Sequence, residues 1–191
     1  TNTIDEDTYY YLLATLLESA DKVANTASVY GAYLKHIKKT AAVDLKIRPA
    51  DFETTNASHQ VYQGDANELV KTIQGDILYL DPPYNARQYG GNYHMLNTIV
   101  EYKSFEPKGI TGLSEYNRSA YCSKASVKQS FEELIANAKF KYTFLSYNNE
   151  GLMSHEEITS ILEKYGRVEL NTCIFYTSYA ADELLVVHLG G

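Results

Sequence analysis

Apolar and polar residues follow distinct periods along the chain, and each period predicts a type of element. In residues 5–25, apolar side chains recur every three or four positions, which is the spacing of one helix face. A shorter stripe with the same spacing predicts a second helix over residues 29–37. Alternation of apolar and polar residues then favours a short strand at residues 43–47, ended by Pro49.

Strand and helix patterns alternate from residue 59 onward. Residues 59–63 favour a strand, and Asp65 then opens a helix with Glu68 in the capping-box position and Gly75 at its end. The next five residues, Asp76-Ile-Leu-Tyr-Leu80, form a mostly apolar run that is typical of a strand covered on both faces. An acidic residue directly follows this strand, at the end where open α/β sheets bind ligands.

The remaining patterns complete an α/β order of elements, with three further helices and three further strands. The helices cover residues 93–102, residues 131–138 and a segment that begins at Ser154, where Glu157 has capping-box spacing. The strands cover residues 141–147, 167–175 and 183–189. The last two strands are close enough in sequence to pair as an antiparallel hairpin. Residues 103–125 are polar and form a stretch too long for an idle connection.

The composition is that of one globular intracellular domain. A chain of 191 residues can bury one sizeable core. Hydrophobic residues make up 45% of it, but no apolar run is long enough to cross a bilayer and no signal-peptide pattern opens the chain. Cys122 and Cys173 are the only cysteines and form no Cys-x-x-Cys pattern, so neither a disulfide framework nor a thiolate zinc site is expected. We therefore expect a soluble, intracellular protein without a metal ion.

The net charge of −7 excludes a uniformly basic surface that coats nucleic acid. Any contact with DNA must therefore be local. Lysines and arginines gather in two places, residues 35–48 and residues 87–128. The first group is explained by solvated helix and loop faces. The second group flanks the acidic residue after the apolar strand, and both a solvated surface and a local contact with DNA stay open for it.

Asp81-Pro82-Pro83-Tyr84 suits the methylation of an exocyclic amine. The lone pair of such an amine is delocalised into the base, so an acceptor must draw the nitrogen toward tetrahedral geometry before it attacks a methyl donor. Asp81 offers a carboxylate for this task, and the two prolines restrict the backbone around it. Tyr84 offers an aromatic platform for a base flipped out of the duplex. The alternative is a plain turn at the end of a strand, because Asp and Pro are common turn residues.

Four runs of sequence extend this motif into a resemblance that covers most of the chain. They are Ala20-Asp-Lys-Val-Ala-Asn-Thr-Ala-Ser-Val-Tyr-Gly31, Val61-Tyr-Gln-Gly-Asp-Ala66, Asp76-Ile-Leu-Tyr-Leu-Asp-Pro-Pro-Tyr-Asn-Ala-Arg-Gln-Tyr-Gly-Gly-Asn-Tyr-His-Met-Leu-Asn97 and Ser146-Tyr-Asn-Asn-Glu-Gly151. These runs resemble the adenine-specific DNA methyltransferases of bacterial restriction-modification systems, the group that includes Dam and the FokI modification enzyme.

The resemblance implies a fold and a reaction. The fold would be α/β, a partial doubly wound S-adenosylmethionine-dependent methyltransferase sheet with a C-terminal antiparallel hairpin and extra N-terminal helices. Residues 1–191 would form a single catalytic domain, with a helical part at 1–57, a catalytic core at 58–191 and a candidate recognition loop at 103–125. This domain would transfer a methyl group from S-adenosylmethionine to the exocyclic amine of a flipped adenine in double-stranded DNA.

The resemblance also implies the site residues. Asp81, Pro82, Pro83 and Tyr84 would be catalytic, and Asp65, Ala66 and Asp81 would contact the cofactor. Asp65 would accept a hydrogen bond from the adenine amine of the cofactor, and its other reading is a helix cap. Substrate contacts would come from Tyr84 and the loop after it, namely Asn85, Arg87, Gln88, Tyr89, Asn92 and Tyr93. We expect His94 to be structural, because methyl transfer to an activated amine needs no imidazole base.

One feature departs from that family. Its members bind the methionine part of the cofactor through a Phe-x-Gly-x-Gly loop after the first strand, and no glycine precedes Gly31 here. Matched to the family sheet, the predicted strands are its third to seventh. The missing first two would lie between the third and fourth. We therefore expect a missing N-terminal segment, or another chain, to complete the sheet, and the 191-residue chain alone to bind S-adenosylmethionine poorly.

Other functions stay open at this point. A methyltransferase for the cytosine amine or for RNA would use the same chemistry, and a glutamine-modifying protein methyltransferase would be expected to have Asn at position 81. From a different class, the chain could be a non-catalytic DNA-binding or assembly module that has lost the cofactor loop.

Overall fold

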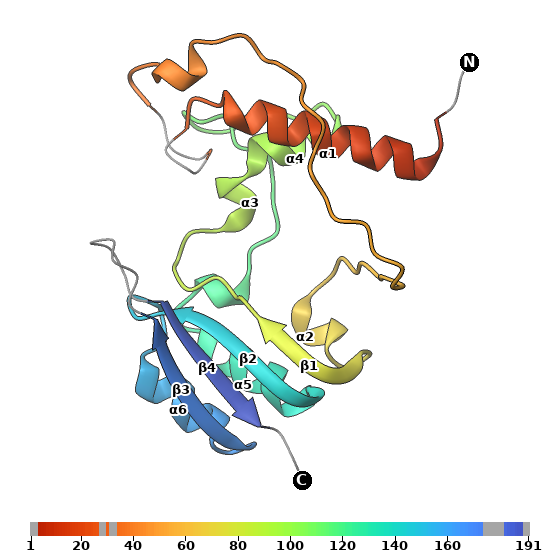
Figure 1. Cartoon of the computed structure of the whole chain (residues 1–191). Helices are drawn as coiled ribbons and strands as arrows, with labels where there is room; N and C mark the ends of the chain where they lie inside the picture. The colour runs from red at the N-terminus through yellow and green to blue at the C-terminus, as the bar shows by residue number, and fades with distance from the viewer. Residues whose placement is uncertain (1–3, 27–29, 31–33, 174–181, 189–191) are drawn as a thin grey trace. The chain divides into compact units, whose positions relative to one another are not determined.

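The computed structural model describes residues 4–26, 30, 34–173 and 182–188 (Figure 1). The chain divides into two compact units. The first unit comprises Thr1–Ser58 and Tyr89–Asn117, and the second comprises His59–Gln88 and Arg118–Gly191. The chain therefore leaves the second unit after Gln88 and returns to it at Arg118.

A sheet forms the centre of the second unit (Figure 1). Within the described residues its strands are β1 (Gln74–Leu80), β2 (Lys139–Asn148), β3 (Arg167–Cys173) and β4 (Asp182–His188). They lie in the order β1-β2-β4-β3. β1 is parallel to β2, whereas β4 is antiparallel to both β2 and β3. The strands predicted at 76–80, 141–147, 167–175 and 183–189 are thus confirmed as far as the described residues reach, and residues 174, 175 and 189 lie outside them. β1 and β2 form the parallel pair expected of an α/β sheet.

The helices of the second unit are α2 (Ala66–Leu69), the 3₁₀ helix η2 (Ala120–Cys122), α5 (Val127–Asn137) and α6 (His155–Leu162). Figure 1 shows α5 and α6 on one face of the sheet. The fully buried side chains of Phe131, Leu145 and Ile158 join α5, β2 and α6 in one core. The predicted capping box of α6 is confirmed: Ser154 Oγ accepts from the Glu157 amide at 3.3 Å, and Glu157 Oε2 accepts from the Ser154 amide at 2.9 Å.

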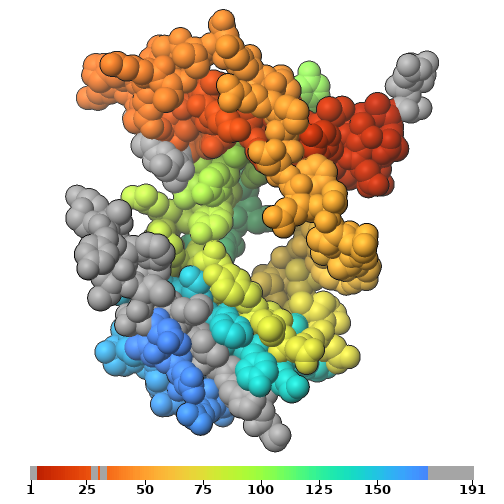
Figure 2. Space-filling view, in the orientation of Figure 1, coloured from red at the N-terminus to blue at the C-terminus, as the bar shows by residue number. Residues whose placement is uncertain are grey.

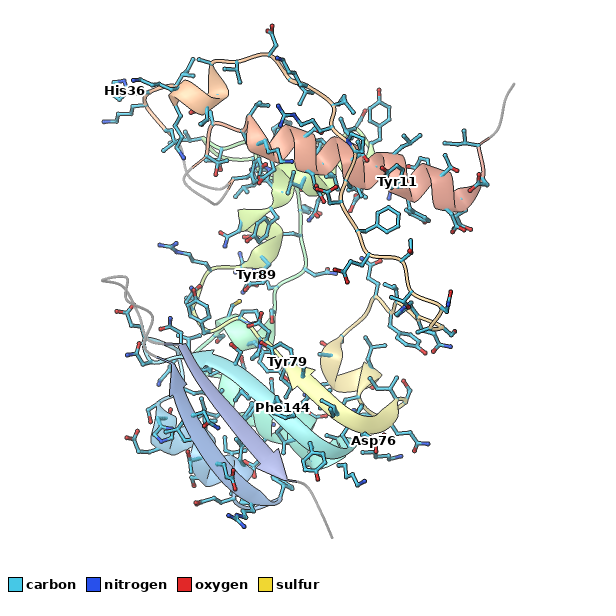
Figure 3. The ribbon with its side chains drawn as sticks, viewed as in Figure 1. Tyr11, His36, Asp76, Tyr79, Tyr89 and Phe144 are labelled. Atoms are coloured by element: carbon cyan, nitrogen blue, oxygen red, sulfur yellow. The ribbon has the colours of Figure 1, made fainter. Side chains whose placement is uncertain are left out.

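The other face of β1 is open within the described residues. Leu78 and Leu80 pack against the core, but Ile77 and Tyr79 are each 62% exposed. Tyr79 is in register with Phe144 of β2, and Figure 3 shows both on the face of the sheet opposite the helices. In Figure 2, residues of β1 (yellow) and β2 (cyan) lie side by side at the surface. The prediction of a strand covered on both faces is therefore wrong for this part of the chain.

The segment before β1 also differs from its prediction. Residues 59–63 form no strand, and Val61 is 96% exposed. A short segment cannot form a strand without a neighbour to bond, and residues 59–63 have none among the described residues. α2 ends at Leu69 and Gly75 lies inside β1, so Gly75 does not end the helix. Glu68 forms no capping box either, because its carboxylate binds Lys71 at 2.7 Å.

The first unit is helical. Its elements are α1 (Glu6–Lys22), the 3₁₀ helix η1 (Lys39–Ala41), α3 (Tyr89–Asn92) and α4 (His94–Glu101), with an isolated bridge between Lys108 and Leu113. The helices predicted for residues 5–25 and 93–102 are confirmed. Of the helix predicted at 29–37, residues 29 and 31–33 lie outside the described residues, and the described residues 34–37 form no helix, so the prediction is wrong for that part. The strand predicted at 43–47 is wrong: these residues form no ladder, and their apolar side chains are exposed.

Buried polar side chains attach a coil segment to α1. Ser19 Oγ accepts a hydrogen bond from the Arg48 amide at 3.1 Å, and Thr15 Oγ1 accepts one from the Ala50 amide at 3.2 Å. Because Thr15 and Ser19 are buried, these bonds satisfy groups that would otherwise be desolvated without a partner. None of the helices in the described part of the chain combines the length and apolarity needed to span a membrane.

Candidate active site

Asp81 is the first residue after β1, as the sequence predicts. Its side chain is exposed, and among the described residues its carboxylate has no hydrogen-bond donor and no ion-pair partner. Pro82 and Pro83 follow it and are half-buried. The carboxylate is therefore anchored by a rigid backbone but keeps its acceptor capacity for a molecule that comes from outside.

Tyr84 is held through its backbone. Its carbonyl oxygen accepts a hydrogen bond from the Leu152 amide at 2.7 Å, and the residue is 37% exposed. Leu152 belongs to the turn after β2. The buried Tyr147 holds this turn in place, because its hydroxyl accepts a hydrogen bond from the Met153 amide at 3.2 Å. Gly151 is required in this turn, because a Cβ atom there would lie 2.2 Å from a ring carbon of Tyr147. Tyr84 thus presents an accessible ring from a fixed backbone position.

The next residues form a tight turn. Asn85 Oδ1 accepts a hydrogen bond from the Arg87 amide at 2.9 Å, which is the bond of an Asx turn. The Arg87 side chain is exposed and able to reach a phosphate. Gln88, by contrast, is committed to the protein: its Oε1 accepts from the Ser119 amide at 2.8 Å, and its Nε2 donates to the Ser119 carbonyl at 3.3 Å. A role for Gln88 in touching a nucleotide would require it to break both bonds.

Asp65 lies in the same unit and caps α2. Its Oδ1 accepts from the Asn67 amide at 2.9 Å, whereas its other oxygen has no donor among the described residues. Asp65 and Ala66 are exposed. The helix-cap reading and the cofactor reading are therefore compatible, because the cap uses only one of the two carboxylate oxygens. This free oxygen fits a hydrogen bond from the adenine amine of S-adenosylmethionine.

Tyr89, Asn92 and Tyr93 belong to the first unit. The Tyr89 and Tyr93 rings pack edge to face, with centroids 5.8 Å apart and planes at 87°, and both rings are partly exposed. The Asn92 carbonyl accepts from the Tyr30 amide at 2.6 Å. His94, next in the chain, is 1% exposed, and neither ring nitrogen has a hydrogen-bond partner among the described residues.

Several residues that support this arrangement carry no local signal in the sequence. Ser119 bonds Gln88 from 31 positions away, and Tyr121 bonds Asn67, beside Asp65, from 54 positions away. Only long-range contacts identify them. Across the described ranges, no three His, Cys, Asp or Glu side chains are grouped so that they could hold a metal ion.

Comparison with known proteins agrees with these features. Residues 1–161 match the family of D12 class N6 adenine-specific DNA methyltransferases. The type II methyltransferase M.NlaIII of Neisseria lactamica is 65% identical over 170 residues, which is 89% of this chain and 51% of that protein. M.FokI of Planomicrobium okeanokoites is 45% identical, over 87% of this chain and 26% of that protein. M.CviAII of Paramecium bursaria Chlorella virus 1 is 42% identical, over 87% of this chain and 50% of its own length.

No solved structure matches the chain significantly. The chain spans about half the length of M.NlaIII and M.CviAII and about a quarter of M.FokI. The family match nevertheless covers most of the chain and includes β1 and the Asp81 that follows it. The chain therefore belongs to the D12 class of N6 adenine-specific DNA methyltransferases.

Proposed function

We propose that the protein transfers a methyl group from S-adenosylmethionine to the N6 amine of adenine in double-stranded DNA, as the modification enzyme of a restriction-modification system. The observation that carries this proposal is the exposed, unpartnered carboxylate of Asp81, directly after the parallel strand β1 and directly before two prolines and a tyrosine. Family membership supports the same reaction, and DNA as the substrate implies the bacterial cytoplasm.

The proposed roles follow from the chemistry of the amine. The Asp81 carboxylate accepts one N6 hydrogen bond and the Pro82 carbonyl accepts the other, so the nitrogen lone pair turns out of the plane of the base. The Tyr84 ring stacks on the flipped base, and the Leu152 bond to its backbone keeps the ring in place. Bound S-adenosylmethionine supplies the methyl group, and Asp65 and Ala66 hold its adenine ring.

The residues after the turn are proposed to contact the DNA. Arg87 has an exposed guanidinium, which suits a phosphate, and Asn85 is fixed beside it by the Asx turn. Tyr89, Asn92 and Tyr93 supply further contacts to the extruded nucleotide. Residues 103–125 are proposed to read part of the recognition sequence, within a catalytic domain that uses residues 1–57 as a helical part.

Replacement of Asp81 by Ala tests the assignment of the acceptor. In the complete methyltransferase that contains this chain, we expect Asp81→Ala to lower the rate of methyl transfer by at least about 100-fold, because the amine loses its preorganised acceptor. The measurement is the incorporation of labelled methyl groups into DNA, with nucleoside analysis of the product.

The matched control is Asp76→Ala, which removes an exposed carboxylate from the same strand and breaks only a 3.9 Å contact with Lys141. Wild-type rates in Asp81→Ala would refute the assignment. A methylated cytosine or RNA product would support the alternative substrates instead, and DNA binding without any methylation would support the non-catalytic module.

We propose further that polypeptide beyond these residues completes the doubly wound sheet beside β1 and carries the glycine loop for the methionine part of the cofactor. Three observations support this: β1 pairs only with β2 among the described residues, Ile77 and Tyr79 are exposed, and residues 59–63 form no strand. In this proposal a strand bonds the free edge of β1, and a helix covers Ile77 and Tyr79.

Cofactor affinity tests this second proposal. Titration calorimetry of the isolated 191-residue chain is expected to give weak S-adenosylmethionine binding, because Asp65, Ala66 and Asp81 would hold it without the glycine loop that binds its methionine part. The complete methyltransferase, titrated in the same buffer, is expected to bind at least about 100-fold more tightly. Equal affinities for the two proteins would refute the proposal.

A further inference from the structure

Residues 119–122, which we call the clip, contact the loop after Tyr84 and the helix that Asp65 caps. The clip consists of Ser119 and the 3₁₀ helix η2 that Ser119 caps. It lies just before α5, at the point where the chain has returned to the second unit. All the contacts described below are within that unit.

The first set of contacts holds the loop after Tyr84. The Gln88 amide group bonds the backbone of Ser119 as both donor and acceptor, so its orientation is fixed. Next to it, the thiol of Cys122 donates to the Arg87 carbonyl at 3.3 Å. Cys122 is 5% exposed, and burial raises the pKa of its thiol, so the group stays protonated and able to donate. The clip therefore holds the end of this loop in place through its contacts with Arg87 and Gln88.

The second set of contacts holds the start of α2. The Tyr121 hydroxyl donates to Asn67 Oδ1 at 2.7 Å, and Asn67 Nδ2 donates to the Ser130 carbonyl of α5 at 2.9 Å. The Asn67 backbone amide donates to Asp65 Oδ1. Burial raises the pKa of the Tyr121 phenol, and the negative charges of Asp65 and Glu133 add to this effect, so the hydroxyl stays a donor. The side chain of Tyr121 is thus linked to the Asp65 carboxylate through Asn67 alone.

We propose that the clip is a positioning element for methyl transfer, which keeps the cofactor-side group Asp65 and the loop of Tyr84 and Arg87 in fixed relative positions. This inference rests on the proposed function. The positioning residues are the clip residues Ser119, Tyr121 and Cys122 together with Gln88, which the clip bonds. Each of them bonds other protein groups instead of the reacting atoms. Gln88, which the sequence predicts to contact the nucleotide, is therefore assigned a supporting role instead.

Two variants of the complete methyltransferase test the two sets of contacts of the clip separately. Tyr121→Phe removes the hydroxyl that donates to Asn67 Oδ1 and also lies 3.3 Å from the Ser130 carbonyl. We expect the Kd for S-adenosylmethionine to rise about fivefold to tenfold while the KM for DNA stays within twofold. Gln88→Ala removes both bonds to Ser119, so we expect the KM for DNA to rise or kcat to fall by about tenfold, with cofactor Kd unchanged.

Controls test whether the effects are specific. Tyr165→Phe removes a hydroxyl from a partly exposed tyrosine of the same unit, outside the clip, and is expected to leave both constants unchanged. Gln88→Glu keeps the acceptor for the Ser119 amide but loses the donor, so it should recover part of the activity lost in Gln88→Ala. Thermal melting of each variant reports stability separately.

The outcomes are distinct. A rise in cofactor Kd for Tyr121→Phe at an unchanged KM for DNA, together with partial rescue by Gln88→Glu, supports the clip. A cofactor Kd for Tyr121→Phe equal to that of Tyr165→Phe overturns it. A rise in both Kd and KM together with a fall in kcat and melting temperature also overturns it, because that pattern indicates only a structural role. If Asp81→Ala retains activity, the proposed function fails, whatever the titrations of Tyr121→Phe give.

Discussion

At the residue scale, Asp81 keeps its side chain free of hydrogen bonds to the described part of the protein, whereas Tyr84 is held through its backbone. Asp81 is anchored by the prolines that follow it, and its exposed carboxylate is spent on no protein donor among the described residues. Tyr84 instead spends its carbonyl on Leu152 and leaves its ring accessible. Substitutions that act on the chemistry should therefore separate from substitutions that act on the position of the ring.

Gly151→Ala is predicted to act on position and stability. The new Cβ would meet the Tyr147 ring at 2.2 Å and the Asn148 carbonyl oxygen at 2.8 Å, so the turn that bonds Tyr84 must shift. We expect a loss of about 1–3 kcal/mol in the free energy of unfolding, measured by urea denaturation. Gly64→Ala is the control, since its Cβ would make only ordinary contacts with Leu69, at 3.5 Å and beyond. Equal stability of the two variants would contradict the prediction.

Local signals in the sequence were sufficient for single residues whose partners are near in the chain. Ser154 and Glu157 are three positions apart, and their capping box is present as predicted. Asp81 directly follows its strand for a similar reason, because the strand and the proline pair are contiguous. The bonds of Gln88 could not be predicted, since Ser119 is 31 positions away and nothing in the sequence of either residue specifies the other.

At the element scale, α6 offers a test of the charge at its first turn. The pKa of Glu157 is held below its ordinary value, first by the Ser154 amide and then by Lys128. A carboxyl with a depressed folded pKa contributes stability above its unfolded pKa and loses that contribution as the pH falls through the folded pKa. We therefore expect Glu157→Gln to be less stable than the wild type at neutral pH and equally stable in acid.

Chemical denaturation across this pH range measures the difference. Glu163→Gln, just beyond the end of the same helix, controls for the loss of a surface carboxylate. A stability difference between Glu157→Gln and wild type that is independent of pH would show that packing, rather than charge, accounts for the effect.

The wrong strand predictions share one physical cause. Residues 43–47 alternate apolar and polar side chains, and residues 59–63 contain the strand-favouring pair Val61 and Tyr62, but a strand also needs a partner for its backbone groups. Residues 76–80 have one in β2, and they form β1. Periodicity identifies which side chains prefer burial, whereas pairing depends on the rest of the sheet, and that part of the fold could not be predicted from short windows.

At the scale of the whole molecule, the open edge of β1 should govern the behaviour of the isolated chain. A strand with free backbone groups and exposed Ile77 and Tyr79 is a template for another strand. We predict that the 191-residue chain self-associates, and that Ile77→Lys weakens this association by about tenfold in sedimentation measurements, because a charge at the edge opposes pairing.

Ile110→Lys is the matched control, since Ile110 is 89% exposed but lies in a turn outside any strand. An equal effect of the two substitutions would point to a general influence of charge on solubility. The complete methyltransferase, whose additional polypeptide is proposed to cover this edge, should stay monodisperse under the same conditions.

The paired bonds between Gln88 and Ser119 have a consequence for how such proteins diversify. They hold together the two points at which Tyr89–Asn117 leaves and rejoins the second unit. With both ends of that segment held side by side, doubling its length adds only about 0.6 kcal/mol of closure entropy. Evolution could therefore lengthen, shorten or exchange this segment, which includes the loop proposed to read DNA, by recombination, while the second unit with Asp81 is inherited unchanged.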